Sequence, residues 1–140
     1  MLVDQSKTPQ ARNFGEQEPQ YYRLTINYND VGAPAGAAQK FGALPARAFI
    51  TAVMYSVETA FNAGTNNNVS IGTSTTATEI LAATAMTGSG FTNATAAAGL
   101  GLAATAAGPT TLYLKFALSG TAATAGKATI IIQYLLDNDL

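Results

Sequence analysis

A chain of 140 residues has the length of one domain and can bury about two-thirds of the surface that it exposes when unfolded. Only 11% of its residues are charged and its net charge is −1, so it has no field that would attract nucleic acid or an anionic membrane. The sequence has no cysteine and no histidine, which excludes disulfides, thiolate catalysis, a serine–histidine pair and the usual zinc ligands.

The low charge content also bears on how the surface is used. A surface with few charged side chains is weakly protected against association, and a partner usually covers much of it. No window has the roughly eighteen consecutive apolar residues of a membrane-spanning helix, and the first ten residues lack the apolar core of a secretory signal. We therefore expect a protein that is made in the cytoplasm and binds other proteins rather than a membrane or nucleic acid.

The first twenty residues differ from the rest of the chain. Residues 1–20 are polar, contain two prolines and show no hydrophobic period. We predict an extended N-terminal arm over residues 1–20, followed by one folded domain over residues 21–140. The arm would become ordered on a neighbouring subunit, with Arg12 and Phe14 as its anchoring side chains. A frayed tail explains the same composition.

Alternating apolar and polar residues predict strands along the first half of the domain. The first strand covers residues 21–29, and a short strand around residues 39–44 ends at Pro45. A long strand is predicted over residues 48–61, and a short one over residues 69–72 pairs back with it. Two sets of residues alternate along the long strand. One set is Phe49, Val53, Tyr55, Val57 and Phe61, and the other is Ile50, Ala52, Met54 and Ser56.

The connections between these strands are rich in turn-forming residues. Asparagine and glycine, which accept positive φ, predict a turn over residues 61–68. Residues 73–87 fit either a strand or one helical turn behind a capping pattern formed by Thr76 and Glu79. Residues 88–108 are mostly small, and we predict one or two short strands within a long loop there.

The C-terminal stretch, residues 109–137, carries the clearest pattern in the chain. In its first arm every second residue is large and apolar, so that these residues share one face. They are Leu112, Leu114, Phe116 and Leu118. Its second arm, residues 130–135, is apolar on both faces. Such a strand lies in the middle of a sheet, with its second face either covered by the same domain or packed against a partner. We predict a hairpin joined by residues 120–126.

The strand count and spacing indicate the fold class. About eight short strands, separated by turns at intervals of roughly ten residues, are typical of an all-β jelly roll or two-sheet antiparallel sandwich. The predicted architecture is therefore all-β, with the extended N-terminal arm preceding the sandwich.

The sequence offers no pattern of catalytic or ligand-binding residues. Its carboxylates are scattered, and Glu58 and Glu79 are the two from the folded body that could act as a pair, yet nothing in the sequence links them. Residues 99–104 match a loose glycine-rich nucleotide-binding pattern, but no apolar strand precedes them and no acidic residue follows at the required distance. We predict a protein that is not an enzyme and that has no cofactor and no metal site.

Three phrases resemble those of small structural proteins of tailed phages. They are Thr59-Ala-Phe-Asn-Ala-Gly-Thr65, Val69-Ser-Ile-Gly-Thr73 and Gly120-Thr-Ala-Ala-Thr-Ala-Gly-Lys-Ala-Thr-Ile-Ile-Ile-Gln-Tyr134. Together they make residues 21–137 similar to the jelly-roll cement, or decoration, proteins of phage heads. The resemblance implies a virion protein on the capsid surface that binds between major capsid protein subunits and braces the shell after it expands. It implies no catalytic residues.

The residues expected at such an interface follow from exposure and position. We predict contacts through Arg12 and Phe14 of the arm, through Tyr21 at the rim, and through Asn66, Asn67 and Asn68 in a loop at one end of the sandwich. The partners would be the major capsid protein and a second copy of the chain, with a homodimer favoured over a trimer. The phrases also fit a phage fibre, neck or adhesin-like module that binds a receptor or glycan. An enzyme with a polar cleft is the third hypothesis, which the residue inventory disfavours.

Overall fold

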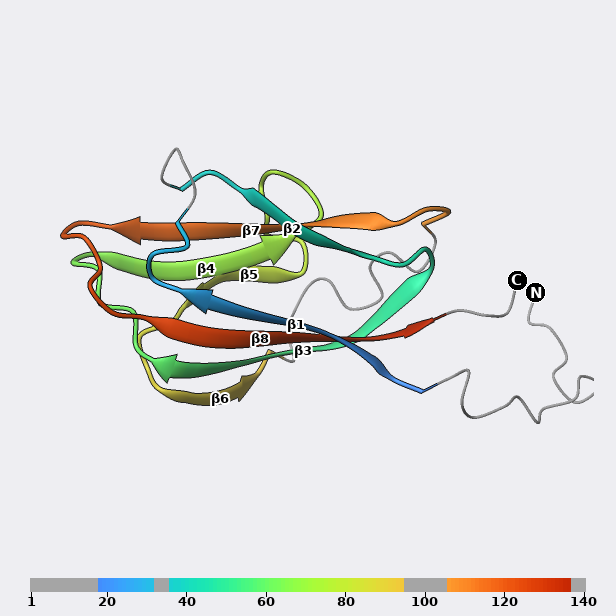
Figure 1. Ribbon diagram of the computed structural model, residues 1–140, viewed down its shortest axis with the longest axis horizontal. Coiled ribbons are helices and arrows are strands. Elements are labelled where there is room, and N and C mark those ends of the chain that lie inside the picture. Colours follow the sequence, from blue (N-terminus) through green and yellow to red (C-terminus); the bar gives the residue numbers. More distant parts are fainter. Residues whose placement is uncertain (1–17, 32–35, 95–105, 137–140) are drawn as a thin grey trace, which may run out of the picture.

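A computed structural model describes residues 18–31, 36–94 and 106–136, which form eight strands (Figure 1). The strands are β1 (Gln20–Asn27), β2 (Gln39–Leu44), β3 (Ala48–Thr59), β4 (Asn66–Gly72), β5 (Leu81–Ala85), β6 (Gly90–Asn93), β7 (Thr110–Ser119) and β8 (Lys127–Leu136). The described residues include no helix that is long and apolar enough to cross a bilayer. The predicted arm anchors Arg12 and Phe14 and the residues 95–105 lie outside the described parts of the chain.

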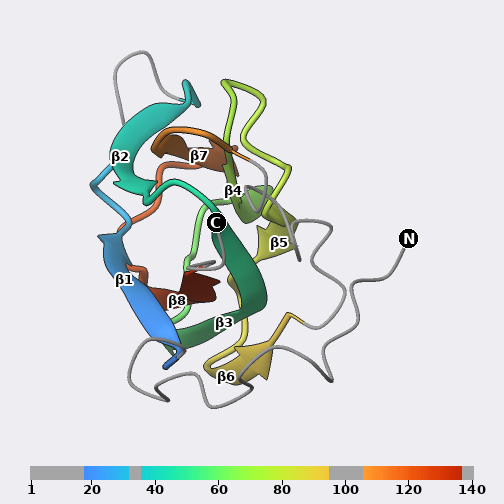
Figure 2. The same ribbon diagram turned by 90° about the vertical axis from the view of Figure 1, so that its right-hand side faces the viewer.

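The strands form two four-stranded antiparallel sheets that face each other as two layers (Figure 2). Sheet A has the order β1-β8-β3-β6, and sheet B has the order β2-β7-β4-β5. The pairs β1–β8, β2–β7, β3–β6 and β4–β5 alternate between the two sheets, as if one long hairpin had been rolled up. This is the strand arrangement of a jelly roll, so the predicted fold class is confirmed.

The core lies between the two sheets, where every second residue of each strand points inward. In β7 the side chains of Leu112, Leu114 and Phe116 are buried, as the alternation predicted. In β8, which lies between β1 and β3, Ile130 and Ile132 are each 1% exposed. The prediction that this strand is central to a sheet is confirmed, and its second face looks away from the core of the sandwich.

Several predictions differ from the structure. Residues 120–126 do not close a hairpin, because β7 lies in sheet B and β8 in sheet A, and β4 pairs with β5 and β7 instead of pairing back with β3. The segment after Gly72 contains β5 and no helical turn, so the strand alternative for residues 73–87 is the correct one. The turn predicted over residues 61–68 is shorter, because β4 already begins at Asn66 and pairs with β7 from there. The prediction that Asn66, Asn67 and Asn68 lie in a loop is therefore wrong, because the pairing with β7 continues to the first residue of β4.

One predicted face of β3 is partly inverted. Phe49 was expected on the same face as Val53, but a β-bulge between Ile50 and Ala52 shifts the register of β3 against β8. One extra residue moves all preceding side chains to the opposite face of a sheet. As a result, Ile50 is fully buried and Phe49 is 47% exposed.

Candidate interaction surfaces

The asparagines of β4 lie at the end of the sandwich where β7 turns into β8. The amide of Asn67 is used internally, because its Oδ1 accepts from the Ala63 N–H at 2.7 Å and its Nδ2 donates to the Ala63 carbonyl at 2.9 Å. Asn66 donates to the Ser119 hydroxyl at 2.9 Å, and Asn68 is half-buried. Asn67, which is 8% exposed, therefore fixes the turn before β4, and Asn66 ties that turn to β7.

Tyr21 lies far from this asparagine cluster. It pairs with Gln133 near the C-terminal end of β8, whereas Asn66 pairs with Ser119 of β7 at the other end of the sandwich and in the other sheet. Its side chain is 60% exposed. The structure thus does not bring the predicted interface residues Tyr21 and Asn66 together on one surface.

Two turns interlock at the asparagine end of the sandwich. The side chain of Asn62 donates to the Thr124 hydroxyl at 2.9 Å and accepts from the backbone N–H groups of Thr124 and Ala125 at 2.9 and 3.0 Å. The Gly64 N–H also donates to the Thr121 carbonyl at 2.9 Å. These turns belong to two of the sequence phrases on which the phage resemblance rests, so segments about sixty residues apart in sequence form one structural unit.

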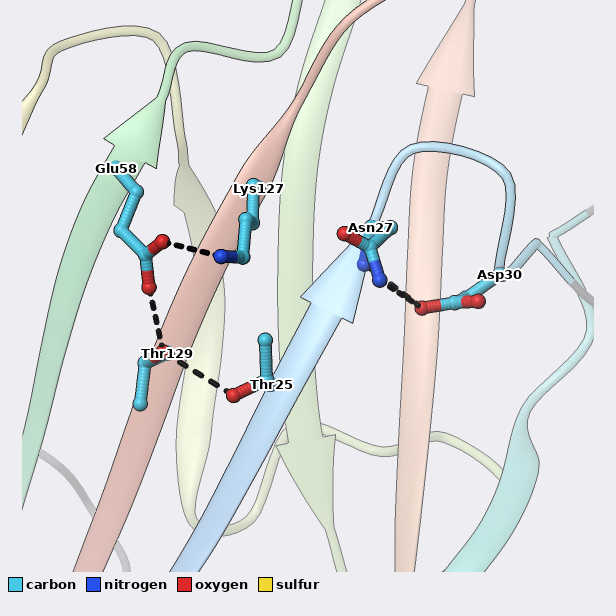
Figure 3. Close-up of polar contacts among 6 residues, drawn as sticks. All are labelled: Thr25, Asn27, Asp30, Glu58, Lys127 and Thr129. Atoms are coloured by element: carbon cyan, nitrogen blue, oxygen red, sulfur yellow. Dashed lines mark hydrogen bonds and ion pairs between the residues drawn. The ribbon is translucent and has the colours of Figure 1, made fainter.

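An open groove of about 460 Å³ lies beside these turns. Its lining includes Asn27, Thr59, Thr124 and Lys127, and the ammonium of Lys127 pairs with the Glu58 carboxylate at 2.6 Å. Asn27 is likewise occupied, since its backbone N–H donates to Asp30 at 2.7 Å (Figure 3). Several of the polar groups that line the groove are therefore already bonded within the chain.

Glu58 forms a small polar network on the outer surface of sheet A (Figure 3). The Thr129 hydroxyl donates to Glu58 Oε1 at 3.0 Å and lies 3.2 Å from the Thr25 hydroxyl. The hydrogen bonds from Lys127 and Thr129 lower the pKa of Glu58 below its usual value. The network joins β1, β8 and β3, and the described residues contain no group of three acidic side chains that could hold a metal ion.

Glu79, the carboxylate that the sequence offered as a possible partner of Glu58, organises the turn between β4 and β5. Its carboxylate accepts hydrogen bonds from the hydroxyls of Ser74 and Thr76 and from the backbone N–H groups of Thr73 and Thr78. These donors favour the charged form and lower the pKa of Glu79 to about 2. The Thr76–Glu79 pattern therefore closes a turn and does not start a helix.

The Glu79 turn gives a pH dependence with a defined sign. Because the folded pKa lies below the ordinary value of 4.5, the stabilisation is present above pH 4.5 and is lost as the pH falls towards 2. We expect Glu79→Gln to lower the thermal midpoint at pH 7, with the difference from the native chain shrinking between pH 4.5 and 2. Thermal unfolding of both proteins across this range measures it. A difference that is the same at pH 7 and pH 2 would contradict this role.

Sheet A exposes large apolar side chains on its outer face. The large hydrophobic residues exposed in the described parts of the chain are Tyr21 on β1, Phe49 on β3 and Phe91 on β6, at 60%, 47% and 66%. All three belong to this sheet, and their chain neighbours Tyr22 and Ile50 point into the core. The three aromatic side chains therefore share the face that points away from sheet B.

Strand pairing shows which residues lie between these aromatic side chains. In the antiparallel register, Tyr21 lies opposite Gln133, Phe49 opposite Leu135, Met54 opposite Ile131, and Ser56 opposite Phe91. Residues that are opposite each other in a sheet point to the same face. We call this surface the apolar face, and it comprises Tyr21, Phe49, Met54, Phe91, Ile131 and Leu135.

Comparisons with known proteins add one observation. No protein-family model matches the chain, and no curated protein matches it. Among solved structures, it is similar to a chain of the Cyanophage Pam1 capsid asymmetric unit, with a TM-score of 0.63 and 18% identity over 87% of each chain. The two chains share a fold. Because the matched part is the same share of both, they are also of similar length.

The apolar face was not predicted from the sequence, apart from Tyr21 at its rim. Phe49 was predicted on the same face as Val53, which is buried, because the bulge in β3 has no clear sequence signal. Phe91 lies in a segment of small residues, where a lone phenylalanine on a four-residue edge strand gives no period to read. The apolar character of both faces of β8 was the one signal that pointed to this surface.

Proposed function

We propose that this protein is a structural component of a phage head, a cement or decoration protein that binds the outside of the capsid. In this role it would bridge major capsid protein subunits and stabilise the shell. Assembly would take place in the cytoplasm of the host. Nucleic acid, membranes, cofactors and catalysis have no part in the proposal.

The observation that carries the proposal is the likeness to a chain of the Cyanophage Pam1 capsid asymmetric unit. It extends over 87% of both chains, so it covers a whole domain and not one shared motif. The sequence phrases that resemble cement proteins support it, because two of them form the interlocked turns at one end of the sandwich. A protein that only clamps its neighbours needs apolar surface and a rigid scaffold, and it needs no titrating side chain.

Self-association is part of the proposal. Of the four strands at the sheet edges, β1 is the longest, with eight residues against six, five and four in β2, β5 and β6. A long unpaired edge can accept a strand from another chain, so a homodimer would form by pairing two copies of β1. The N-terminal arm, with Arg12 and Phe14, would add contacts to a neighbouring subunit. Several weak contacts on one shell would reinforce one another through effective concentration.

Heads assembled without this chain allow a direct test. We expect the purified chain to sediment with such heads and to raise the denaturant concentration at which they fall apart. A chain lacking residues 1–17, which keeps all eight strands, should bind more weakly than the full chain. If the full chain stays in the supernatant at saturating concentration, the proposed function is wrong.

A further inference from the structure

We infer that the apolar face of sheet A is the surface that this chain places against the capsid shell. The inference rests on the proposed function and adds to it the docking face and the chemistry of the partner. That partner is a largely apolar protein surface with some polar groups, because the outer face of sheet A also carries Arg23, which lies opposite Ile131, and the ion pair of Glu58 with Lys127.

The apolar content of this face is that of a contact surface. A buried aromatic side chain removes about 150–250 Å² from water, and Tyr21, Phe49 and Phe91 are each about half exposed or more. They therefore offer on the order of 300 Å² to a partner, before Met54, Ile131 and Leu135 are added. The largest apolar patch on a typical monomer is about 300–600 Å² and is often functional.

The outer face of sheet B differs in character. It carries Lys40, which lies 6.0 Å from the ring centre of Tyr113, and Lys115 opposite Ser70. Its exposed positions on β7 include Thr111 and Ala117, which are small. An apolar partner would therefore gain little from sheet B, and the two faces of the sandwich are chemically distinct.

The size of the apolar face favours the shell over a second copy as its occupant. Four strands spaced about 4.8 Å apart, the longest of them twelve residues, define a face on the order of 500 Å². A free pair of proteins usually needs about 800 Å² from each partner, whereas on a shell this face can be one of several weak contacts that reinforce one another.

The described part of the chain begins and ends beside the apolar face. Gln20 pairs with Tyr134 and Ala48 pairs with Leu136, so the described chain begins and ends beside the Phe49–Leu135 corner of the apolar face. The residues that precede Gln20 therefore join the fold beside the proposed docking face.

Exposed positions on the two faces provide matched variants. We would compare Tyr21→Asp, Phe49→Asp and Phe91→Asp with Thr111→Asp and Ala117→Asp, which place the same charge on the outer face of sheet B. All five sites are exposed, so thermal unfolding should show that the variants keep the fold. Binding is measured by sedimentation with heads assembled without the chain.

We expect each apolar-face variant to bind these heads at least about tenfold more weakly, whereas the two sheet B variants stay within about twofold of the native chain. Native binding by all five variants would overturn the inference and leave the proposed function standing. If the native chain does not bind the heads at all, both the inference and the proposed function are wrong. A dimer in solution that Phe91→Asp dissociates would assign the face to a second copy and also overturn the inference.

Discussion

Replacing Ile132 by aspartate should unfold the protein. Ile132 is 1% exposed and lies in the central strand of sheet A, between Tyr22 of β1 and Val53 of β3. A carboxylate at this position cannot be solvated, and the described core offers no basic group to pair with it. The expected loss is about 5 kcal/mol or more, comparable with the whole stability of a typical domain.

The neighbouring residue supplies the control for this prediction. Gln133 lies on the same strand but points to the outer face, so Gln133→Asp should keep the fold. Circular dichroism and thermal unfolding of the two variants measure the difference. A folded Ile132→Asp protein with the native thermal midpoint would show that β8 does not hold the sandwich together.

Replacing Gly126 by alanine should cause the second largest loss. Gly126 has a φ of +151°, which side-chain-bearing residues rarely adopt, and a Cβ there would lie 2.5–2.9 Å from ring atoms of Phe61. Phe61 is 2% exposed and packs against Phe116, so its ring has little room to move. We expect a loss of about 3 kcal/mol, because the substitution combines backbone strain with overpacking.

A second glycine separates this local effect from the general cost of a glycine substitution. A Cβ at Gly88 would meet nothing within 4 Å, and its φ is not in the restricted positive range. Gly88→Ala should therefore leave the denaturation midpoint almost unchanged. Equal midpoints for Gly126→Ala and Gly88→Ala would mean that the contact between the two interlocked turns does not stabilise the domain.

The sequence predicts the fold well wherever alternation is unbroken. The strand β7 was located because Leu112, Leu114 and Phe116 repeat with a period of two, and one buried face requires that period. The predicted hairpin with β8 is wrong, because β7 pairs within sheet B and β8 within sheet A, so residues 120–126 connect the two sheets. The alternation failed at Phe49, where a bulge exchanges the two faces of β3. Asn67 was predicted in a loop because asparagine and glycine are frequent in residues 61–68. In the structure its amide is buried and forms hydrogen bonds with the backbone N–H and carbonyl of Ala63.

The interaction surface could be predicted only in small part. The apolar face gathers residues from four strands, and Tyr21, Phe91 and Ile131 become neighbours only through the order of the strands in sheet A. The hydrophobic period within one strand does not indicate the order of the strands in the sheet. The predicted anchors Arg12 and Phe14 lie outside the described residues and stay predictions, as does the absence of enzymatic activity.

The composition of purified virus particles tests the central claim most directly. Quantitative mass spectrometry of particles made from the genome that encodes this chain would give its copies per major capsid protein. We predict that the chain is present in a copy number comparable to that of the major capsid protein. On mild denaturation, the particles should lose the chain and the stability of the shell together. A dozen copies or fewer per particle would indicate a neck or fibre component, and absence from the particles would contradict a structural role in the virion.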